Sequence, residues 1–579
     1  MTGFDLVVRG ATIADGTGGP LREGDVGVAD GVIRAVGDVR GTGAEEVDAR
    51  GWVVAPGFID PHTHLDANLF WDPDVTPSSS FGVTTVVTAN CGYGLAPVSD
   101  ASRDYVIAAM STVEQIPEES IREGVPFDWS SLATYADRLD RLDVAVNHAF
   151  LVGHVPLRSA VLGVPAVHER EATGDEVAAM VQLLREGLAL GALGFSTDQV
   201  IGNPGPGGTK LPGQVCAEDE LLAFARALGA GPGPGVLAMA NAAMLQGRAE
   251  READLAWHER LAEASGRPVV VGPIFEGHDD PGTGVHILDR TWRGRRPGVT
   301  VVPQISTRPF ELWTRLDAPG LVVRALPTLD AAVRAGDVAS VARDSAARAR
   351  MRAEGDRVSP TPVWSGRWEH VFVRYTHQPG VWERDVASVA TDRGVHPVDV
   401  LLDVALADGF ETQVASVMRN GDDDAVASLV VHPAAMVGAS DAGAHVLSNT
   451  DSCYAVWVLQ HWVRERRVLP LERAIAMLTG DQARLLGLGD RGLVRPGLAA
   501  DLVVFDPDRI ATTGVRYVDD QPAGGRRLVT DATGVELSAV NGVVATRGGV
   551  PTGSRSGRRL RPTPLRPAPL RPTPLRVGP

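Results

Sequence analysis

Lysine, cysteine and long apolar runs are all scarce in this sequence, and each scarcity excludes a class of protein. Lys210 is the only lysine among 579 residues, and acidic residues outnumber basic ones 72 to 55, which gives a net charge of −17. This charge disfavours nucleic acids and anionic membranes as partners. The three cysteines, Cys91, Cys216 and Cys453, are far apart, form no disulfide framework and fit a reducing compartment. With no apolar run of about 18 residues and no charged-then-apolar leader, we expect a cytoplasmic protein.

Patterns of buried strands alternate with helical patterns through most of the chain. Thr173 and Glu176 form a capping box that predicts a helix over residues 177–190. Eight apolar segments are typical of buried strands: Val53–Ile59, Thr84–Ala89, Val144–Val152, Ala192–Ser196, Val236–Ala240, Pro268–Ile274, Val301–Ile305 and Ala435–Ala439. Strands that alternate with helices form parallel sheets, and eight of them indicate an α/β fold of the (β/α)8 TIM-barrel type.

The two ends of the chain differ in pattern from this repeating body. Residues 1–55 and 490–550 contain short alternating runs, which predict one small β-sandwich domain built from both termini. Residues 56–489 would form the barrel, and the long connection at 308–392 predicts an inserted subdomain or lid. Residues 551–579 include a five-residue repeat rich in Pro and Arg, so we expect a disordered tail, which is either a basic docking segment or a non-functional extension.

The most informative motif is His62-Thr63-His64, which follows an apolar run and so stands at the end of a predicted strand. Side chains two residues apart on a strand point to the same side, and two such imidazoles make half of a divalent-metal site, most often for Zn²⁺. Barrel enzymes carry their active sites at the carboxyl ends of the strands. Cys91 follows the second predicted strand and Asp441 follows the eighth. These ligand types predict a zinc site, with Asp441 also available as a general base.

Two more histidines stand close to the ends of predicted strands, where they could bind substrate. His154 follows the third strand, and His445 follows the eighth. For His154 the alternative is a core histidine whose N–H is satisfied internally. For Cys91 the alternative is a small buried hydrophobic residue.

Several longer motifs resemble the amidohydrolase superfamily and, within it, the N-acyl-D-amino-acid deacylase (D-aminoacylase) family. The superfamily likeness lies in residues 56–66 (PGFIDPHTHLD), 440–445 and 490–506. The deacylase likeness lies in residues 82–92 (GVTTVVTANCG) and 191–197. The resemblance implies a metal-dependent barrel that hydrolyses an amide bond. Carried over by position, it makes metal ligands of His62, His64, Cys91 and Asp441, and makes Asp441 the catalytic base.

The sequence also departs from this family, which places a metal-binding histidine on each of the fifth and sixth strands. Residues 235–242 contain no histidine, and Pro273 stands about where the sixth-strand histidine is expected. His278 is the nearest possible replacement. Relatives that bridge two metals with a carboxylated lysine are a poor match too, because Lys210 lies in a Gly/Pro-rich loop. We therefore expect one zinc ion per chain.

The predicted function is metal-dependent hydrolysis of an acyl C–N bond, as in an N-acyl-amino-acid deacylase. Arg374 and Arg419 are candidates for binding a substrate carboxylate through paired hydrogen bonds, and the alternative for each is a solvated or structural arginine. Two other functions remain open. One is a different amidohydrolase reaction, either hydrolysis of a cyclic amide or a carbamate, or deamination of an amidine-like carbon. The other is a non-hydrolytic barrel protein that has lost the second metal site.

Overall fold

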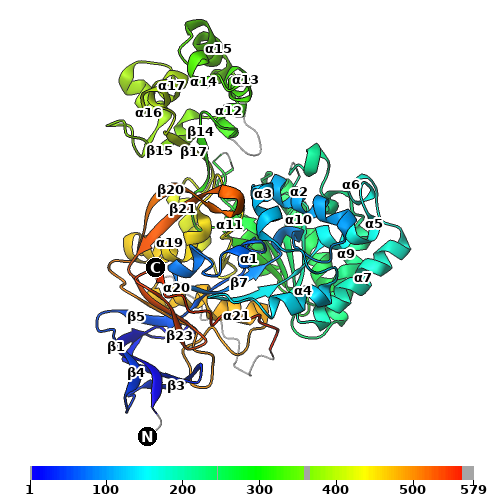
Figure 1. Cartoon of the computed structure of the whole chain (residues 1–579), viewed down its shortest axis with the longest axis vertical. Helices are drawn as coiled ribbons and strands as arrows, with labels where there is room; N and C mark the ends of the chain where they lie inside the picture. Colours follow the sequence, from blue (N-terminus) through cyan, green and yellow to red (C-terminus); the bar gives the residue numbers. More distant parts are fainter. Residues whose placement is uncertain (1–2, 202, 244, 279, 358–365, 564–579) are drawn as a thin grey trace.

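Parallel strands form the centre of the computed structural model, which describes residues 3–201, 203–243, 245–278, 280–357 and 366–563 (Figure 1). One sheet has the order β6-β7-β8 and another the order β9-β10-β11-β12-β13-β18. Their bounds are β6 Phe58–Asp60, β7 Val83–Thr88, β8 Asn147–Phe150, β9 Val152–Gly153, β10 Gly194–Asp198, β11 Val236–Ala240, β12 Val269–Ile274, β13 Val301–Ile305 and β18 Met436–Val437. The strands are buried almost throughout, which explains why they read as continuous apolar runs. Each of the eight predicted segments overlaps at least one of them.

The two parallel sheets are adjacent at both ends of this strand order. The amide of Leu151, between β8 and β9, donates to the carbonyl of Thr88 at 3.1 Å. At the other end, Thr63 forms a parallel bridge with Ala442, which joins the residues after β6 to those after β18. The carboxyl ends of the first and last strands are thereby held side by side.

Helices follow most of these strands and cover the sheets from outside (Figure 1). The longer ones are α2 Asp100–Glu114, α4 Leu132–Leu139, α5 His154–Leu162, α7 Gly174–Ala189, α9 Glu218–Ala230, α10 Arg248–Ser265, α11 Thr283–Arg293, α18 Asp423–Val430, α20 Leu471–Leu478 and α21 Gly480–Leu486. The predicted capping box of Thr173 and Glu176 begins α7, as expected. Residues 471–486 form two helices, α20 and α21, because Thr479 between them has non-helical backbone angles.

A nine-stranded sheet combines strands from the two ends of the chain. Its strands are β1 Phe4–Ile13, β2 Arg22–Ala29, β3 Val32–Gly37, β4 Gly43–Asp48, β5 Val53–Pro56, β19 Leu502–Phe505, β22 Val535–Val540, β23 Val543–Arg547 and β24 Val550–Pro551. β5 lies between β1 and β19, so the N-terminal and C-terminal strands are neighbours. The first predicted strand is therefore divided at Gly57: β5 belongs to this sheet and β6 to the parallel sheet.

A separate lobe follows β13, at the top of Figure 1. Its antiparallel sheet has the order β14-β17-β15-β16, formed by β14 Phe310–Arg315, β15 Val371–Tyr375, β16 Arg384–Asp385 and β17 Gln413–Arg419. Helices α13 Pro327–Ala335, α15 Ser345–Gly355, α16 Val386–Arg393 and α17 Pro397–Ala407 enclose an apolar cluster of their own. Because β17 is part of this sheet, the lobe extends past residue 392, where we expected the insertion to end.

The start of the C-terminal tail is ordered, contrary to our expectation for 551–579. The amide of Gly557 donates to the Val144 carbonyl at 2.9 Å, and the amide of Leu560 donates to the His148 carbonyl at 2.7 Å. The Arg559 guanidinium contacts both oxygens of Asp140, at 2.6 and 2.8 Å. The first part of the tail thus pairs with the start of β8. Residues 564–579, with most of the five-residue repeat, lie outside the described residues.

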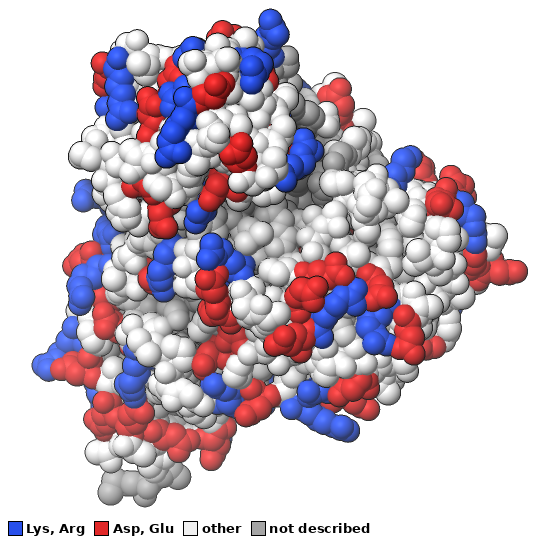
Figure 2. All heavy atoms as spheres, turned by 45° about the horizontal axis from the view of Figure 1, so that its top comes forward, with Lys and Arg blue, Asp and Glu red and all other residues white. Residues whose placement is uncertain are grey.

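Acidic and basic side chains are intermingled over the face seen in Figure 2, without a broad basic area. Within the described ranges, no helix combines the length and apolarity needed to cross a bilayer.

Candidate metal centre

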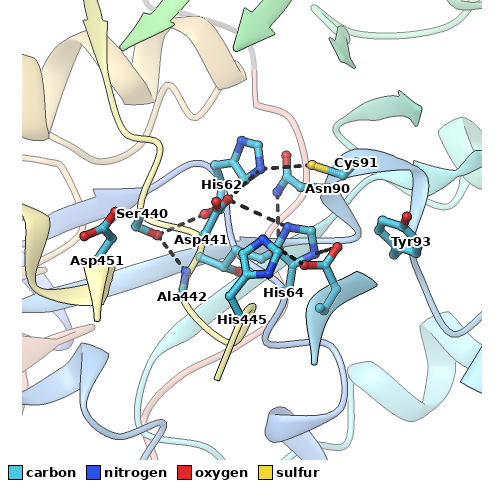
Figure 3. Close-up of polar contacts among 12 residues, drawn as sticks. His62, His64, Asn90, Cys91, Tyr93, Ser440, Asp441, Ala442, His445 and Asp451 are labelled. Carbon is cyan, nitrogen blue, oxygen red and sulfur yellow. Dashed lines mark hydrogen bonds and ion pairs between the residues drawn. The ribbon is translucent and has the colours of Figure 1, made fainter. Parts of the chain in front are cut away.

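His62 and His64 lie just beyond the carboxyl end of β6, and both are buried. The Nδ1 atom of His62 is 2.8 Å from Oε1 of Gln304, at the end of β13. Its Nε2 atom is 3.2 Å from Sγ of Cys91 and 3.2 Å from Oδ1 of Asp441. The Nε2 atom of His64 is 3.9 Å from the same Asp441 oxygen. Figure 3 shows His62, His64, Cys91 and Asp441 facing one another.

The backbone at Cys91 and Asp441 is held in an unusual conformation. Both residues have positive φ angles, 51° and 48°, in the left-handed region that non-glycine residues rarely adopt. The Asp441 loop is fixed by its neighbours: the Ser440 hydroxyl donates to the His62 carbonyl at 2.9 Å, and the His64 amide donates to the Ala442 carbonyl at 2.8 Å. Strain of this kind persists only where surrounding contacts determine it, and it concentrates at functional sites.

The distances between these donor atoms fit a single ion. Donors that lie about 2.0–2.3 Å from a tetrahedral zinc are roughly 3.3–3.8 Å from one another. The measured separations from His62 Nε2 to Cys91 Sγ and to Asp441 Oδ1 are both 3.2 Å. The donor atoms of His62, His64 and Cys91 all lie within 4.8 Å of one another. Two imidazoles, a thiol and a carboxylate therefore lie close together, and all are groups that bind zinc in proteins.

The charge around this cluster also favours a bound cation. Burial raises the pKa of Asp66 to about 7 and that of Asp198 to about 6. Burial, together with nearby carboxylates, also raises the pKa of Glu114 and of the Cys91 thiol well above their ordinary values. Among the described residues, Asp441 and Glu114 form ion pairs only with imidazoles. A divalent ion would supply the missing positive charge.

Two residues of this centre were not predicted from the sequence as site residues, Glu114 and Gln304. Glu114 is the last residue of α2, and its Oε1 is 3.4 Å from Nδ1 of His64. Gln304 precedes the last residue of β13. Position alone could have suggested Gln304, since it lies at the carboxyl end of a barrel strand. No sequence pattern places the end of a helix against the first strand.

Of the two predicted substrate-binding histidines, only His445 lies beside the cluster. Its Nε2 atom is 4.0 Å from Oε2 of Glu114. His154 is enclosed elsewhere: Nδ1 is 2.9 Å from the Thr197 hydroxyl, and Nε2 is 2.8 Å from Oε1 of Glu220. With 1% of its surface exposed and both nitrogens partnered, His154 matches the alternative of a satisfied core histidine.

The predicted substrate arginines lie on the separate lobe. Arg374, on β15, pairs with Glu311 and with Glu383, the latter at 2.6 Å. It lines a cavity of about 540 Å³ between the lobe and the loop after β12. Arg419, at the end of β17, donates to the carbonyls of Met418 and Leu245 at 2.7 and 3.0 Å. The structure therefore does not bring either guanidinium into the metal cluster.

The fifth and sixth strands supply no histidine, in agreement with the sequence. Asn241 follows β11 and donates to Asp254 at 3.2 Å, and Pro273 lies within β12. His278 does not replace the missing ligands: its ring stacks on His370 with centroids 3.7 Å apart, and a ring nitrogen lies 3.1 Å from the Val417 carbonyl.

Comparison with known proteins gives a consistent assignment. The amidohydrolase family model matches residues 45–545. The chain is 31% identical to a D-aminoacylase of Alcaligenes xylosoxydans xylosoxydans over 97% of this chain and 98% of the relative. It is also 31% identical to an N-acyl-D-aspartate deacylase of the same organism, over 91% and 90% of the two chains.

Solved structures show the same relationship. A crystal structure of D-aminoacylase superposes with a TM-score of 0.67 at 29% identity, covering 96% of this chain and 100% of the other. The N-acyl-D-glutamate deacylase of Bordetella bronchiseptica, complexed with zinc and a phosphonate inhibitor, gives 0.65 at 25% identity over 97% and 100%. These neighbours identify the parallel strands as a TIM-barrel catalytic domain. The chain belongs to the amidohydrolase family.

Proposed function

We propose that this protein is a metal-dependent hydrolase that removes the acyl group from an N-acyl amino acid, with N-acyl-D-amino acids the favoured substrates. The observation that carries the proposal is the convergence of His62, His64, Cys91 and Asp441 at the carboxyl ends of the first, second and last strands. The full-length relatives named for D-amino-acid deacylation support the substrate class.

We further propose that each chain binds one zinc ion. A structure of D-aminoacylase is described as having a binuclear metal centre with one-metal activation and second-metal attenuation. In this chain Asn241 and Pro273 occupy the regions where we expect the histidines of a second site, and His278 is engaged with His370. A single ion on the four convergent donors is consistent with these contacts.

The protein side chains have distinct roles in this proposal. A bound zinc ion would activate water and polarise the scissile carbonyl. Asp441 would accept a proton from the attacking water and return it to the leaving nitrogen, since a carboxylate at this position can serve as base and then as acid. His445 lies next to Glu114, beside the metal cluster, and is a candidate to contact the substrate. Arg374 and Arg419 are candidates only if the lobe presents them to the substrate.

The same proposal covers the domain organisation. Residues 1–55 and 490–550 would form a small β-sandwich, and the parallel strands would close as a (β/α)8 barrel over 56–489. The bridge between Thr63 and Ala442 supports closure. The lobe after β13 would act as the insertion or lid. We propose a cytoplasmic enzyme with a small-molecule substrate, and a homo-oligomer remains compatible with it.

Two measurements on the purified full-length chain test the proposal. Elemental analysis should find about one zinc per chain, because the four donors form one cluster. A panel of N-acetyl-D- and N-acetyl-L-amino acids, scored for released amine, should show turnover that a chelator abolishes and zinc restores. Absence of zinc even after supplementation, together with no released amine, would instead favour a barrel protein that has lost hydrolysis.

A further inference from the structure

The carboxylate of Glu114 lies in an unusual position, at the buried carboxyl end of a helix. It ends α2, where the helix dipole is negative, and only 2% of its surface is exposed. Both effects disfavour a charged acid, so a fold would retain one here only for a compensating interaction. In the part of the chain that the structure describes, its ion-pair partners are His64 and His445.

The position of Glu114 is fixed by contacts of the residue that follows it. The next residue, Gln115, has a φ of 57°, which ends the helix, and its side-chain oxygen accepts a hydrogen bond from the Ser448 hydroxyl at 2.9 Å. Ser448 belongs to the loop that follows Asp441. The end of α2 is thereby tied to the segment that carries the last-strand ligand.

Different groups lie beside the two ligand imidazoles on the side away from Asp441. In each ring Nε2 faces Asp441, at 3.2 Å for His62 and 3.9 Å for His64. The opposite nitrogen, Nδ1, is hydrogen-bonded to Oε1 of Gln304 at 2.8 Å in the first ring; in the second ring it lies 3.4 Å from Oε1 of Glu114 and is otherwise without a hydrogen-bond partner among the described residues. An imidazole that binds a metal through Nε2 carries its proton on Nδ1, which therefore needs an acceptor.

We propose that Glu114 is a positioning residue for the metal centre: with an ion bound, its carboxylate would accept the Nδ1–H of the unpaired His64 nitrogen and hold Nε2 toward the ion, as Gln304 does for His62 with a neutral amide. This inference rests on the proposed function, because it assigns a partner to one of its ligands. The carboxylate also makes the His64 ring a stronger donor than the amide makes the His62 ring, so the two ligands are not equivalent.

The proposal distinguishes Glu114 from a residue that merely completes the fold. A structural role predicts lower stability with unchanged metal binding. A positioning role predicts weaker metal binding and altered ligand geometry, even when the chain remains folded. Glu220 provides the matched control, because it is equally buried and also contacts an imidazole, that of His154, outside the metal cluster.

The test compares the wild type with Glu114→Gln, Glu114→Asp and Glu220→Gln as full-length proteins. Zn²⁺ affinity is measured by competition with a chelator, and Co²⁺ loading gives a visible absorption spectrum that reports ligand geometry. We expect Glu114→Gln to bind Zn²⁺ about 10–100-fold more weakly, the usual cost of losing such a support, and to change the Co²⁺ spectrum. Glu114→Asp should recover part of the affinity, and Glu220→Gln should match the wild type in both readouts.

The outcomes separate this inference from the proposed function. If Glu114→Gln keeps wild-type Zn²⁺ affinity and an unchanged Co²⁺ spectrum, Glu114 is not a positioning residue, although the metal centre itself stands. If the wild type takes up neither ion, both proposals fail together. Should Glu114→Gln not fold, Glu114→Asp decides by the same two readouts.

Discussion

Two buried clusters in this chain bring a histidine and a cysteine together with a third donor, and their surroundings differ. His62, His64 and Cys91 form one cluster, and His154, Cys216 and Glu220 form the other. In the first, the imidazole Nε2 atoms point at a shared carboxylate oxygen. In the second, both nitrogens of the imidazole are already bonded.

The main difference is the source of positive charge. Arg158 is fully buried beside the second cluster, and its Nε lies 3.2 Å from Oε1 of Glu220. That guanidinium compensates the carboxylate, so no metal is needed. Beside the first cluster, Asp441 and Glu114 have only imidazoles as ion-pair partners among the described residues. Residue types alone therefore do not distinguish a metal centre from a structural network, whereas the presence of a fixed cation does.

The largest expected effect comes from removing the shared carboxylate of the first cluster. Asp441→Asn should lower turnover about 10²–10⁴-fold, the usual contribution of a general acid–base residue. Zinc content and released amine, measured on the same preparation, check this. Turnover near wild type in a zinc-loaded Asp441→Asn variant would remove Asp441 from the catalytic role.

The next effect concerns the cation of the second cluster. Arg158→Leu leaves the buried Glu220 carboxylate with an imidazole but no guanidinium, and breaking such a pair costs about 3–5 kcal/mol of unfolding free energy. Urea unfolding measures the loss. Zinc content should stay at the wild-type level, since the first cluster is intact. A stability loss under about 1 kcal/mol would show that the ion pair is not what holds this cluster together.

His148, a buried histidine outside both clusters, extends the comparison because its ring donates to a backbone carbonyl, that of Leu139, at 3.2 Å. Burial lowers its pKa to about 4 from the ordinary 6.5. Between pH 4 and pH 6.5, His148 is therefore protonated in the unfolded chain but not in the folded chain. The free energy of unfolding is unaffected by this group above pH 6.5, and it decreases as the pH falls from 6.5 toward 4. His148→Gln should flatten this fall by about 2–3 kcal/mol. Urea midpoints at pH 7.5 and pH 5 measure the slope, and an unchanged slope in the variant would assign the acid sensitivity to other groups.

The smallest effect is expected at Cys216. Burial raises the pKa of this thiol to about 12, so it remains protonated. Its hydrogen bond is to the Gly213 carbonyl at 3.4 Å, which a serine hydroxyl can also make. Cys216→Ser should therefore change stability by less than about 1 kcal/mol and leave zinc content unchanged. Cys91→Ser, in contrast, should weaken zinc binding, because oxygen replaces a soft sulfur ligand. Equal zinc affinities in the two variants would contradict the difference drawn between the clusters.

The sequence was most informative where neighbouring residues decide the structure. Buried strands appear as apolar runs, and the ends of these strands carry His62, Cys91 and Asp441. Contacts between distant segments could not be read in this way. Glu114 reaches His64 from the end of a helix, and the partners of His154 come from two other elements. These contacts depend on packing, which local patterns do not encode.

The pairing of the two chain ends has a consequence for biosynthesis. β5 pairs with β19, and the segment at the start of β8 pairs with residues 557–560. These N-terminal strands therefore lack a neighbour until segments hundreds of residues later have been synthesised. During translation the unpaired strand edges of the N-terminal region stay exposed until the ribosome releases the last part of the chain. Such edges promote aggregation. Truncation before residue 557, or production at high rates, should therefore reduce the soluble yield more than it reduces the activity of the molecules that do fold.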